Sequence, residues 1–306
     1  MFKSTFNPFL ILIYIAVPVG GGWLLYSYRE DLIALPWAPE WMLALLCVGI
    51  LGIFAKAHLQ RLMLLPFDID LKLREGSGLS ILSTIAENLL PIGMGSLIKP
   101  AYLWRVHKLE PTRSGLMVGV STILYTIVSI ALALIASLLL PSEVFIAEAI
   151  LVLALISFVC LLILPLQIGR FVPISIFQKI HDAWKILIRN RALFVKIVAW
   201  QTILVVLDII RLWIGFQIIG QSVGALFTTV VSGVAMLSSW ALITPGAIGW
   251  VEGSVGYISS VYGVGLLEGA TAAFISRIAL LSACLVLYAW ACPRILKEAI
   301  VPTKSA

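Results

Sequence analysis

Charged side chains are scarce in this sequence. Asp, Glu, Lys and Arg make up 12% of its 306 residues, whereas soluble domains carry roughly 25%. Apolar residues reach 61%, and the mean hydropathy is +1.08. This composition excludes a soluble globular fold, and it also excludes intrinsic disorder, which requires low hydrophobicity. Several continuous apolar stretches run about 20 residues, without the alternation of a membrane barrel, so the sequence predicts an all-α polytopic membrane protein.

Residues that bind metals or nucleotides are also few. The three histidines lie far apart, and none of the four cysteines forms a CxxC pair. No GxxxxGK[ST] phosphate-binding loop is present, so we expect no ATP hydrolysis by this chain. We therefore expect no metal and no cofactor. The net charge of +6 favours anionic lipid headgroups over nucleic acid as the partner of the basic loops.

Two of the apolar segments are interrupted by proline and glycine. The predicted segments cover 8–27, 39–57, 78–104, 114–140, 144–166, 192–219, 223–260 and 268–292. The residues that break the helices in 78–104 and 223–260 are Pro91, Gly93, Gly95, Pro245, Gly246 and Gly249. The arms of 78–104 have only 11–14 residues, too few to cross roughly 30 Å, so they predict a re-entrant hairpin. The arms of 223–260 are longer, so two full spans remain an alternative there.

Basic residues favour one orientation in the membrane. With the N-terminus inside and each hairpin returning to its own side, 16 of the 21 Lys and Arg residues lie in inside loops. Only Arg29 lies outside, and four lie within apolar segments. This bias matches the positive-inside rule. We expect a multi-pass protein of the cytoplasmic (inner) membrane with both termini in the cytoplasm.

An internal repeat relates the two halves. Pro91 and Gly95 precede Pro245 and Gly249 by 154 residues, and each broken segment lies between two full spans. The first unit starts outside and the second starts inside, so the sequence predicts inverted-topology repeats, as in many secondary transporters. The predicted regions are an N-terminal span (1–38), a first inverted repeat (39–140), a connecting span with a basic amphipathic interfacial helix (141–191), a second inverted repeat (192–294) and a basic cytoplasmic tail (295–306). An ordinary connector is the alternative for the amphipathic helix.

The two breaks carry recognisable motifs. Residues 245–252 read PGAIGWVE, and Arg277 follows in the next apolar helix, whereas residues 91–99 read PIGMGSLIK. Together they resemble the transmembrane region of lysylphosphatidylglycerol synthases and the stand-alone membrane proteins that share this flippase-like domain. That family has Pro-Gly-Gly-x-Gly-x-x-Glu before an Arg-bearing helix, and a first motif of Pro, Gly four residues later and a basic residue. The resemblance covers roughly 40–295 and implies translocation of a lipid or lipid-linked substrate.

The first motif departs from the family pattern. Ser96 stands where an acidic residue is expected, and Lys99 stands where Arg is expected. The Arg and Asp often found in the following helix are absent from 123–127. We therefore expect the first half to bind its ligand differently. The synthases carry an aminoacyl-transferase domain after the membrane part, and this chain ends at Ala306 without one, so lysyl transfer is not expected.

Six charged residues fall at membrane depth, where a charge is expensive and marks a functional candidate. They are Glu87, Lys99, Asp208, Arg211, Glu252 and Arg277. Glu252 and Arg277 are the strongest candidates, because both flank the second break. Asp208 and Arg211 are spaced i, i+3, so a self-contained structural ion pair is equally plausible. Snorkelling to the interface is the alternative for Lys99, and a protonated carboxyl is the alternative for Glu87.

Positive charge and half-helix N-termini inside the membrane suit a phosphate group. We therefore expect a flippase-like membrane transporter that moves an anionic phospholipid or a polyprenyl-phosphate-linked saccharide between leaflets. An integral membrane transferase acting on such a lipid and an accessory subunit of a lipid or glycan synthesis pathway are the alternatives. An enzyme is not the favoured interpretation, because no cluster of nucleophile, base and metal ligands is evident. Assembly into a homo-oligomer is left open.

Overall fold

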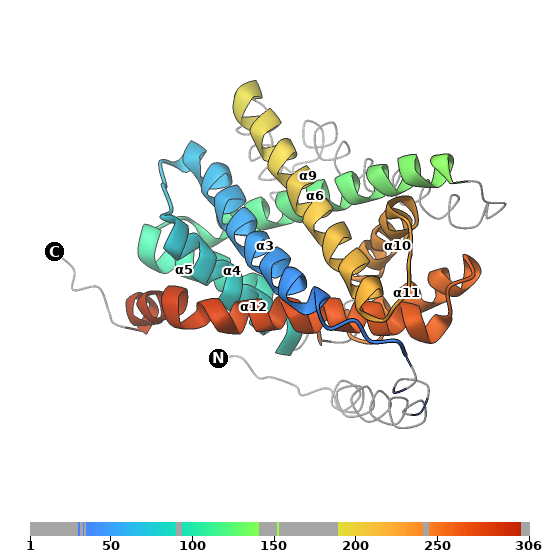
Figure 1. Ribbon diagram of the computed structural model, residues 1–306. Helices are drawn as coiled ribbons and strands as arrows, with labels where there is room; N and C mark the ends of the chain where they lie inside the picture. Colours follow the sequence, from blue (N-terminus) through green and yellow to red (C-terminus); the bar gives the residue numbers. More distant parts are fainter. Residues whose placement is uncertain are drawn as a thin grey trace, which may run out of the picture.

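The computed structural model describes residues 35–89, 94–140, 189–240 and 245–300, together with Glu30, Ile33 and Val152. Every regular element within these residues is a helix (Figure 1). Four of the helices are long and apolar enough to cross a membrane, and they cover Trp41–Phe67, Pro111–Leu139, Arg191–Ile218 and Leu266–Pro293. The chain is therefore an all-α polytopic membrane protein, as the composition predicts.

The described α-helices form two series with the same order of long and short helices, while the 3-10 helices η1 and η2 stand at different places in the two series. The first series is α3 (Trp41–Leu64), η1 (Leu65–Phe67), α4 (Leu73–Leu89), α5 (Met94–His107) and α6 (Pro111–Leu139). The second series is α9 (Arg191–Ile218), α10 (Ala225–Ser238), η2 (Pro245–Ala247), α11 (Trp250–Val261) and α12 (Leu266–Ile300). In each series two short helices stand between two long ones, where the sequence predicts a broken segment between two spans.

Part of the sequence-based description lies outside the described residues. This applies to the predicted spans at 8–27 and 144–166, to nearly all of the amphipathic helix at 171–190, and to Pro91 and Gly93 in the first break. These features stay predictions.

The helices on either side of each break are too short to span a membrane. α4 and α5 have 17 and 14 residues, and α10 and α11 have 14 and 12. At about 1.5 Å per residue they measure roughly 18–26 Å, less than the roughly 30 Å of a hydrocarbon core. These lengths favour the re-entrant interpretation of both segments, which remains a prediction.

The two series run antiparallel and are interlocked. The N–H of Ala38, before α3, donates to the carbonyl of Ile218 at the end of α9 at 2.8 Å, and Leu62 of α3 shares a small cavity with Leu193 at the start of α9 (Figure 1). α4 packs against α12, and α10 packs against α6. Each short helix that enters a break is thus held by the last long helix of the other series.

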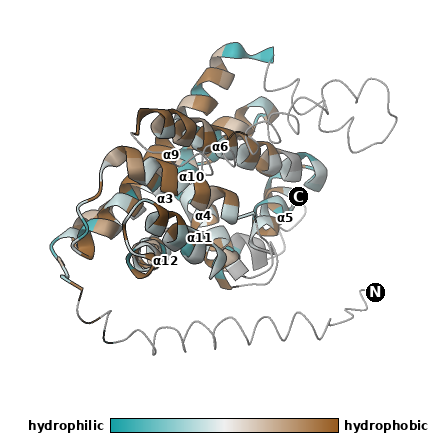
Figure 2. Cartoon of the chain, turned by 90° about the vertical axis from the view of Figure 1, so that its right-hand side faces the viewer, coloured by the Kyte–Doolittle hydropathy of each residue, from teal (hydrophilic) through white to brown (hydrophobic). Residues whose placement is uncertain are grey.

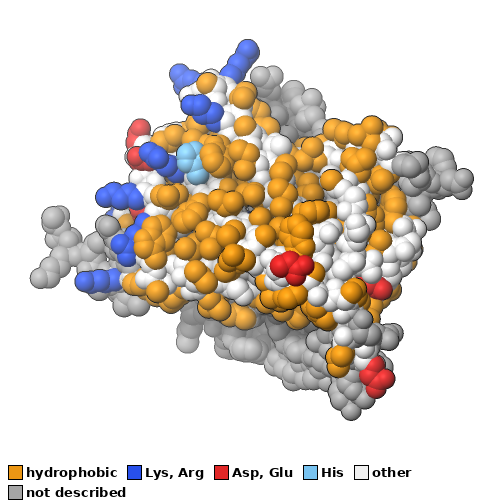
Figure 3. Space-filling model, in the orientation of Figure 1, with side chains coloured by type: hydrophobic (Ala, Val, Ile, Leu, Met, Phe, Trp, Pro, Cys, Tyr) orange, Lys and Arg blue, Asp and Glu red, His pale blue; other side chains and the backbone are white. Residues whose placement is uncertain are grey.

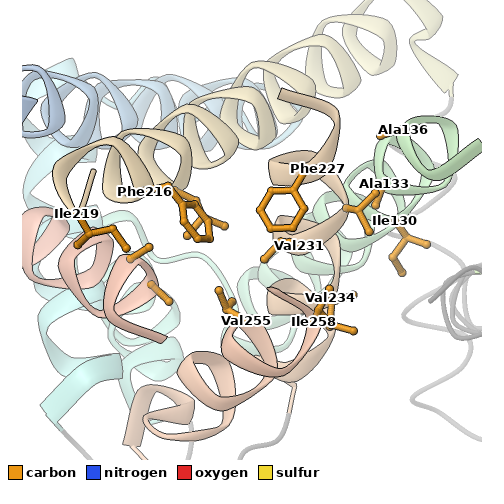
Figure 4. Packing of buried hydrophobic residues seen from close by; sticks show 14 residues of the cluster. Ile130, Ala133, Ala136, Phe216, Ile219, Phe227, Val231, Val234, Val255 and Ile258 are labelled. Atoms are coloured by element: carbon orange, nitrogen blue, oxygen red, sulfur yellow. The ribbon is translucent and has the colours of Figure 1, made fainter. Parts of the chain in front are cut away.

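The largest buried cluster joins the second series to α6. Phe216 of α9, Phe227 of α10 and Ile130 of α6 belong to it (Figure 4). The rings of Phe216 and Phe227 meet edge-on with centroids 5.7 Å apart, a geometry that the ring quadrupoles favour. A Cβ on Gly215 of α9 would lie 2.6 Å from the carbonyl oxygen of Ala272. Glycine therefore lets α9 and α12 approach closely, as is typical of membrane helices.

The surface is divided into an apolar face and a basic end. Figure 2 shows long helices that are mostly hydrophobic, with hydrophilic residues around α5 and at helix ends. Leu43 and Leu285 are 71% and 68% exposed, as suits contact with lipid. In Figure 3 Lys and Arg gather at one end, and α3, α5 and α12 carry Arg61, Arg105 and Lys297 in their last turns. The basic residues are thus concentrated at one end of the helices, away from their apolar sides.

Candidate functional site

A cavity with polar and charged side chains in a largely apolar wall lies where the two broken segments meet. It has a volume of about 480 Å³, within the range of small-molecule sites. Its lining residues from the broken segments are Leu79, Glu87, Asn88, Ser96, Lys99, Leu103, Met236, Ser239, Trp240, Gly246 and Ala247. α6 and α12 add Thr122 and Arg277 to the wall. The end of α4, the start of α5, the end of α10 and the second break therefore converge on one space.

Arg277 of α12 ties three other elements to the edge of this cavity. Its Nε donates to Oε1 of Glu252 on α11 at 2.7 Å. Its Nη1 donates to Oδ1 of Asn88 on α4 at 2.9 Å and to the carbonyl of Gly246 at 2.7 Å. The side chain is only 15% exposed. One guanidinium thus links the last helix of the second series to both broken segments.

Glu252 stands at the start of α11 and has two functions there. Its Oε2 accepts the backbone N–H of Gly249 at 2.8 Å, which caps the first turn of the helix. Its Oε1 accepts from Arg277, and the side chain is 12% exposed. A carboxylate near a helix N-terminus is also favoured by the helix dipole. Glu252 is therefore the counterion of Arg277 and the cap of α11 at once.

The second break has a left-handed backbone. Gly246, Ala247 and Gly249 have φ values of 57°, 52° and 86°. A Cβ at Gly246 would lie 2.9 Å from Oδ1 of Asn88 and 3.0 Å from Nη1 of Arg277. Glycine at 246 thus serves both the turn and the approach of the guanidinium. Ala247 adopts a conformation that costs an L-residue roughly 1–2 kcal/mol.

In the first break, Gly95 lets α5 fold closely against the end of α4. A Cβ at this position would lie 2.4 Å from both the backbone nitrogen and Cγ of Glu87. Ser96 and Lys99, in the first turns of α5, line the cavity. Any side chain at 95 would push these cavity residues away from α4. Gly95 therefore keeps Lys99, about one turn later on α5, beside the cavity.

Charges of both signs line the cavity. Lys99 interacts electrostatically with Glu87 and with Lys56 of α3. Arg277 is neutralised by Glu252, which is its partner but does not itself line the cavity. The positive end of the α5 dipole adds to the field at Ser96. The lining therefore contains two cations, one of which is bonded to the carboxylate of Glu252.

Asp208 and Arg211 lie outside the cavity lining. Nη1 of Arg211 meets Oδ1 of Asp208 at 2.5 Å, and the hydroxyl of Tyr125 on α6 donates to Oδ2 of Asp208. Ser276, next to Arg277 on α12, donates its hydroxyl to the carbonyl of Arg211 at 3.0 Å. The pair thus contacts α6 through a side chain and α12 through the backbone. This arrangement joins helices of the two series.

The charged residues predicted from the sequence thus fall into two groups, those at the cavity and the Asp208–Arg211 pair outside it. Lys99, Glu87 and Arg277 line the cavity, with Glu252 directly behind Arg277. The neutral members of the lining were not predicted, chief among them Asn88 and Trp240. Asn88 lies in the last turn of α4 and Trp240 lies two residues after α10, each just before a break. An amide and an indole at these positions within apolar segments are the signal from which they could have been found.

In the described residues no group of three or more His, Cys, Asp and Glu side chains is placed to hold a metal ion. Neither a curated protein nor a solved structure matches the chain. The family described as the lysylphosphatidylglycerol synthase TM region matches residues 11–287. That range contains both broken segments and every residue of the cavity. The chain therefore belongs to the family of the lysylphosphatidylglycerol synthase transmembrane region.

Proposed function

We propose that this protein is a transporter that moves a phosphate-bearing lipid or lipid-linked saccharide between the two leaflets of the membrane. The observation that carries the proposal is the single cavity between the two breaks, lined by Arg277 and Lys99. Arginine suits a phosphodiester because its planar fork can donate two parallel hydrogen bonds. The family is named for enzymes whose product is a lipid, which agrees with a lipid substrate.

The arrangement of the helices supports transport. The antiparallel directions of α3 and α9 and the reciprocal packing of α4 on α12 and α10 on α6 are what inverted repeats at 39–140 and 192–294 require. In such transporters the substrate site lies at broken helices near the middle of the membrane. The basic helix ends agree with an orientation in which this end faces the cytoplasm, with both termini on that side of the cytoplasmic membrane.

The Glu252–Arg277 pair supplies a mechanism for binding and release. In the empty site Glu252 holds the guanidinium charge and keeps it compatible with the membrane interior. An arriving phosphate competes with Oε1 of Glu252 for Arg277, whereas Oε2 stays on the N–H of Gly249. When the lipid leaves, the carboxylate of Glu252 bonds to Arg277 again, because it has stayed next to the guanidinium.

The proposal is tested by leaflet exchange in proteoliposomes that contain a fluorescent phosphate-bearing lipid. We expect Arg277→Lys to retain only part of the exchange rate and Lys99→Gln to lower it at least tenfold. Lys297→Gln, at the exposed end of α12, is the matched control and should exchange lipid at the parent rate. Equal insertion and melting temperature of all variants make the comparison valid. Parent rates in both cavity variants would refute the proposed function.

A further inference from the structure

Apart from its apolar residues, the wall of the cavity carries three charged side chains and a larger number of neutral polar groups. Six of them are Gln60, Asn88, Ser114, Ser121, Thr122 and Ser239. An ionised phosphodiester only accepts hydrogen bonds, so side-chain oxygens that act as acceptors in this wall cannot bind it. The lining therefore has a recognition capacity that the phosphate does not use.

Two of the hydroxyl groups in this lining are accessible and already donate their protons within the protein, so their oxygens are left as hydrogen-bond acceptors. The hydroxyls of Thr122 and Ser239 donate to carbonyls four and three residues earlier in the chain, at 2.9 and 2.6 Å. A hydroxyl has one donor and two acceptor lone pairs, so the oxygen can still accept from a ligand. This wall therefore suits a ligand that is rich in hydrogen-bond donors.

Two kinds of head group are rich in donors, ammonium groups and hydroxyl groups. An ammonium group would need an available carboxylate. Glu252 is already bonded to Arg277 and to a backbone N–H, and Glu87 interacts with Lys99. Both carboxylates at this site thus already have a cationic partner, so an added ammonium group would have to displace Lys99 or Arg277 to gain a counterion. Hydroxyl donors carry no such penalty.

Trp240 adds a fixed aromatic surface to the same wall. Its Nε1 donates to Oγ1 of Thr126 on α6 at 3.1 Å, and 39% of the residue is exposed. The indole is therefore oriented by a hydrogen bond while part of its surface stays open. An apolar ring face next to hydroxyl-binding side chains suits the C–H face of a sugar ring, because such a ligand is amphipathic in the same way.

We infer that the lipid carries a hydroxyl-rich head group, a saccharide or another polyol, next to its phosphate, and that the walls formed by α6 and α10 recognise it. This inference rests on the proposed function and narrows its substrate class. The phosphate lies against Arg277 and Lys99, and the hydroxyl groups donate to Thr122, Ser239 and their neighbours. One wall of the cavity thus binds the charged phosphate, and another wall selects the head group.

The test is equilibrium binding to the full-length protein in nanodiscs. The probes are a polyprenyl-phosphate-linked hexose, the bare polyprenyl phosphate, phosphatidylglycerol and lysylphosphatidylglycerol. We expect the hexose-bearing lipid to bind at least fivefold more tightly than the bare phosphate, because each added hydrogen bond gives roughly that factor. Tighter binding of phosphatidylglycerol than of the hexose lipid would point to the smaller polyol. Preference for lysylphosphatidylglycerol would overturn the inference.

A pair of matched variants assigns the effect to the cavity. Thr122→Val removes one lining hydroxyl while keeping the shape of the side chain, and it should reduce the preference for hexose over bare phosphate about fivefold. Thr229→Val on α10 removes a hydroxyl with the same helical bond, to the carbonyl of Ala225 at 2.8 Å, outside the cavity lining. This control should keep the full preference. Equal preference in both variants would refute the assignment.

The two proposals fail in different ways. If the hexose adds no affinity while Lys99→Gln still weakens binding of every phosphate-bearing probe, the head-group inference is wrong and the proposed function stands. If Lys99→Gln changes the affinity for none of these probes, the phosphate site itself is wrong. The binding data therefore separate the two conclusions without a transport assay.

Discussion

Replacing Glu252 with Gln removes the charge of the counterion of Arg277 and keeps the size of the side chain. The two carboxylate oxygens accept from Gly249 N–H at 2.8 Å and from Arg277 Nε at 2.7 Å. The amide of Gln has only one acceptor oxygen, so one of these donors loses its partner. Loss of one partner from a buried pair costs about 3–5 kcal/mol. Two neutral acceptors, Asn88 and Gly246, remain on Arg277, so we expect a loss of about 3 kcal/mol.

A double-mutant cycle isolates the interaction. Arg277→Gln should cost about 2 kcal/mol, because Glu252 keeps its bond to the helix start. The double variant contains no unpaired charge, and we expect it to lose about 2 kcal/mol in total, so the coupling is about 3 kcal/mol. The control cycle uses Glu110 and Arg113, which pair at 3.4 Å with side chains 68% and 59% exposed. Its coupling should stay below about 1 kcal/mol.

The measurement is the free energy of unfolding in bicelles, obtained by steric trapping of the full-length protein. Lipid exchange by the same samples serves as a second readout. A coupling for 252 and 277 that equals the control coupling would refute the reasoning. It would mean that each charge is stabilised by its surroundings without its partner. The hydrogen bonds of Arg277 would then not stabilise the structure of the second break.

Three further predictions concern the backbone and the second ion pair. Gly95→Ala should lower the free energy of unfolding by roughly 2 kcal/mol, because the new Cβ would lie 2.4 Å from the backbone nitrogen of Glu87; unchanged stability would refute the close packing. Ala247→Gly should stabilise the protein by about 1 kcal/mol by relieving a φ of 52°, and a lower melting temperature would contradict this. Tyr125→Phe should cost about 1 kcal/mol by removing the bond to Asp208 while lipid exchange stays within twofold; loss of exchange would place that pair in the transport mechanism.

Gly119 on α6 provides the control for the glycine substitution. A Cβ at this position would meet no other atom within 4 Å. Gly119→Ala should therefore leave the packing unchanged and stabilise the helix by roughly 0.5–1 kcal/mol. Opposite signs for the two Gly→Ala variants would separate steric packing from helix propensity.

The positions of the helices could be predicted, because a helix that crosses a bilayer must be apolar over the thickness of the hydrocarbon core. The apolar runs at 192–219 and 114–140 correspond to α9 and α6 within a few residues. The breaks could also be predicted, because proline and glycine remove or weaken helix hydrogen bonds wherever they occur. Helix α12 continues to Ile300, beyond the predicted 268–292, because its last turns lie past the apolar run that marks the span.

The lining of the cavity was harder to predict, because it depends on which helices cross. Intramembrane charge selected Lys99 and Arg277, which line the cavity, but it also selected Asp208 and Arg211, which pair with each other outside it. Asn88 accepts from Arg277 only because α4 packs against α12. Such a contact joins residues from opposite halves, and no local pattern in the sequence encodes it.

The exchange of packing partners between the halves has a consequence for synthesis of the protein. α4 is made early, but α12, the helix that it packs against, begins only at Leu266. At about 5–20 residues per second, the ribosome needs roughly 10–35 s to reach it. During that interval the α4–α5 hairpin, with Glu87 and Lys99, lacks its final neighbour. We therefore expect newly inserted chains to need the translocon or a membrane chaperone to shield α4 and α5, and we expect truncated chains that stop before α12 to be degraded by membrane proteases.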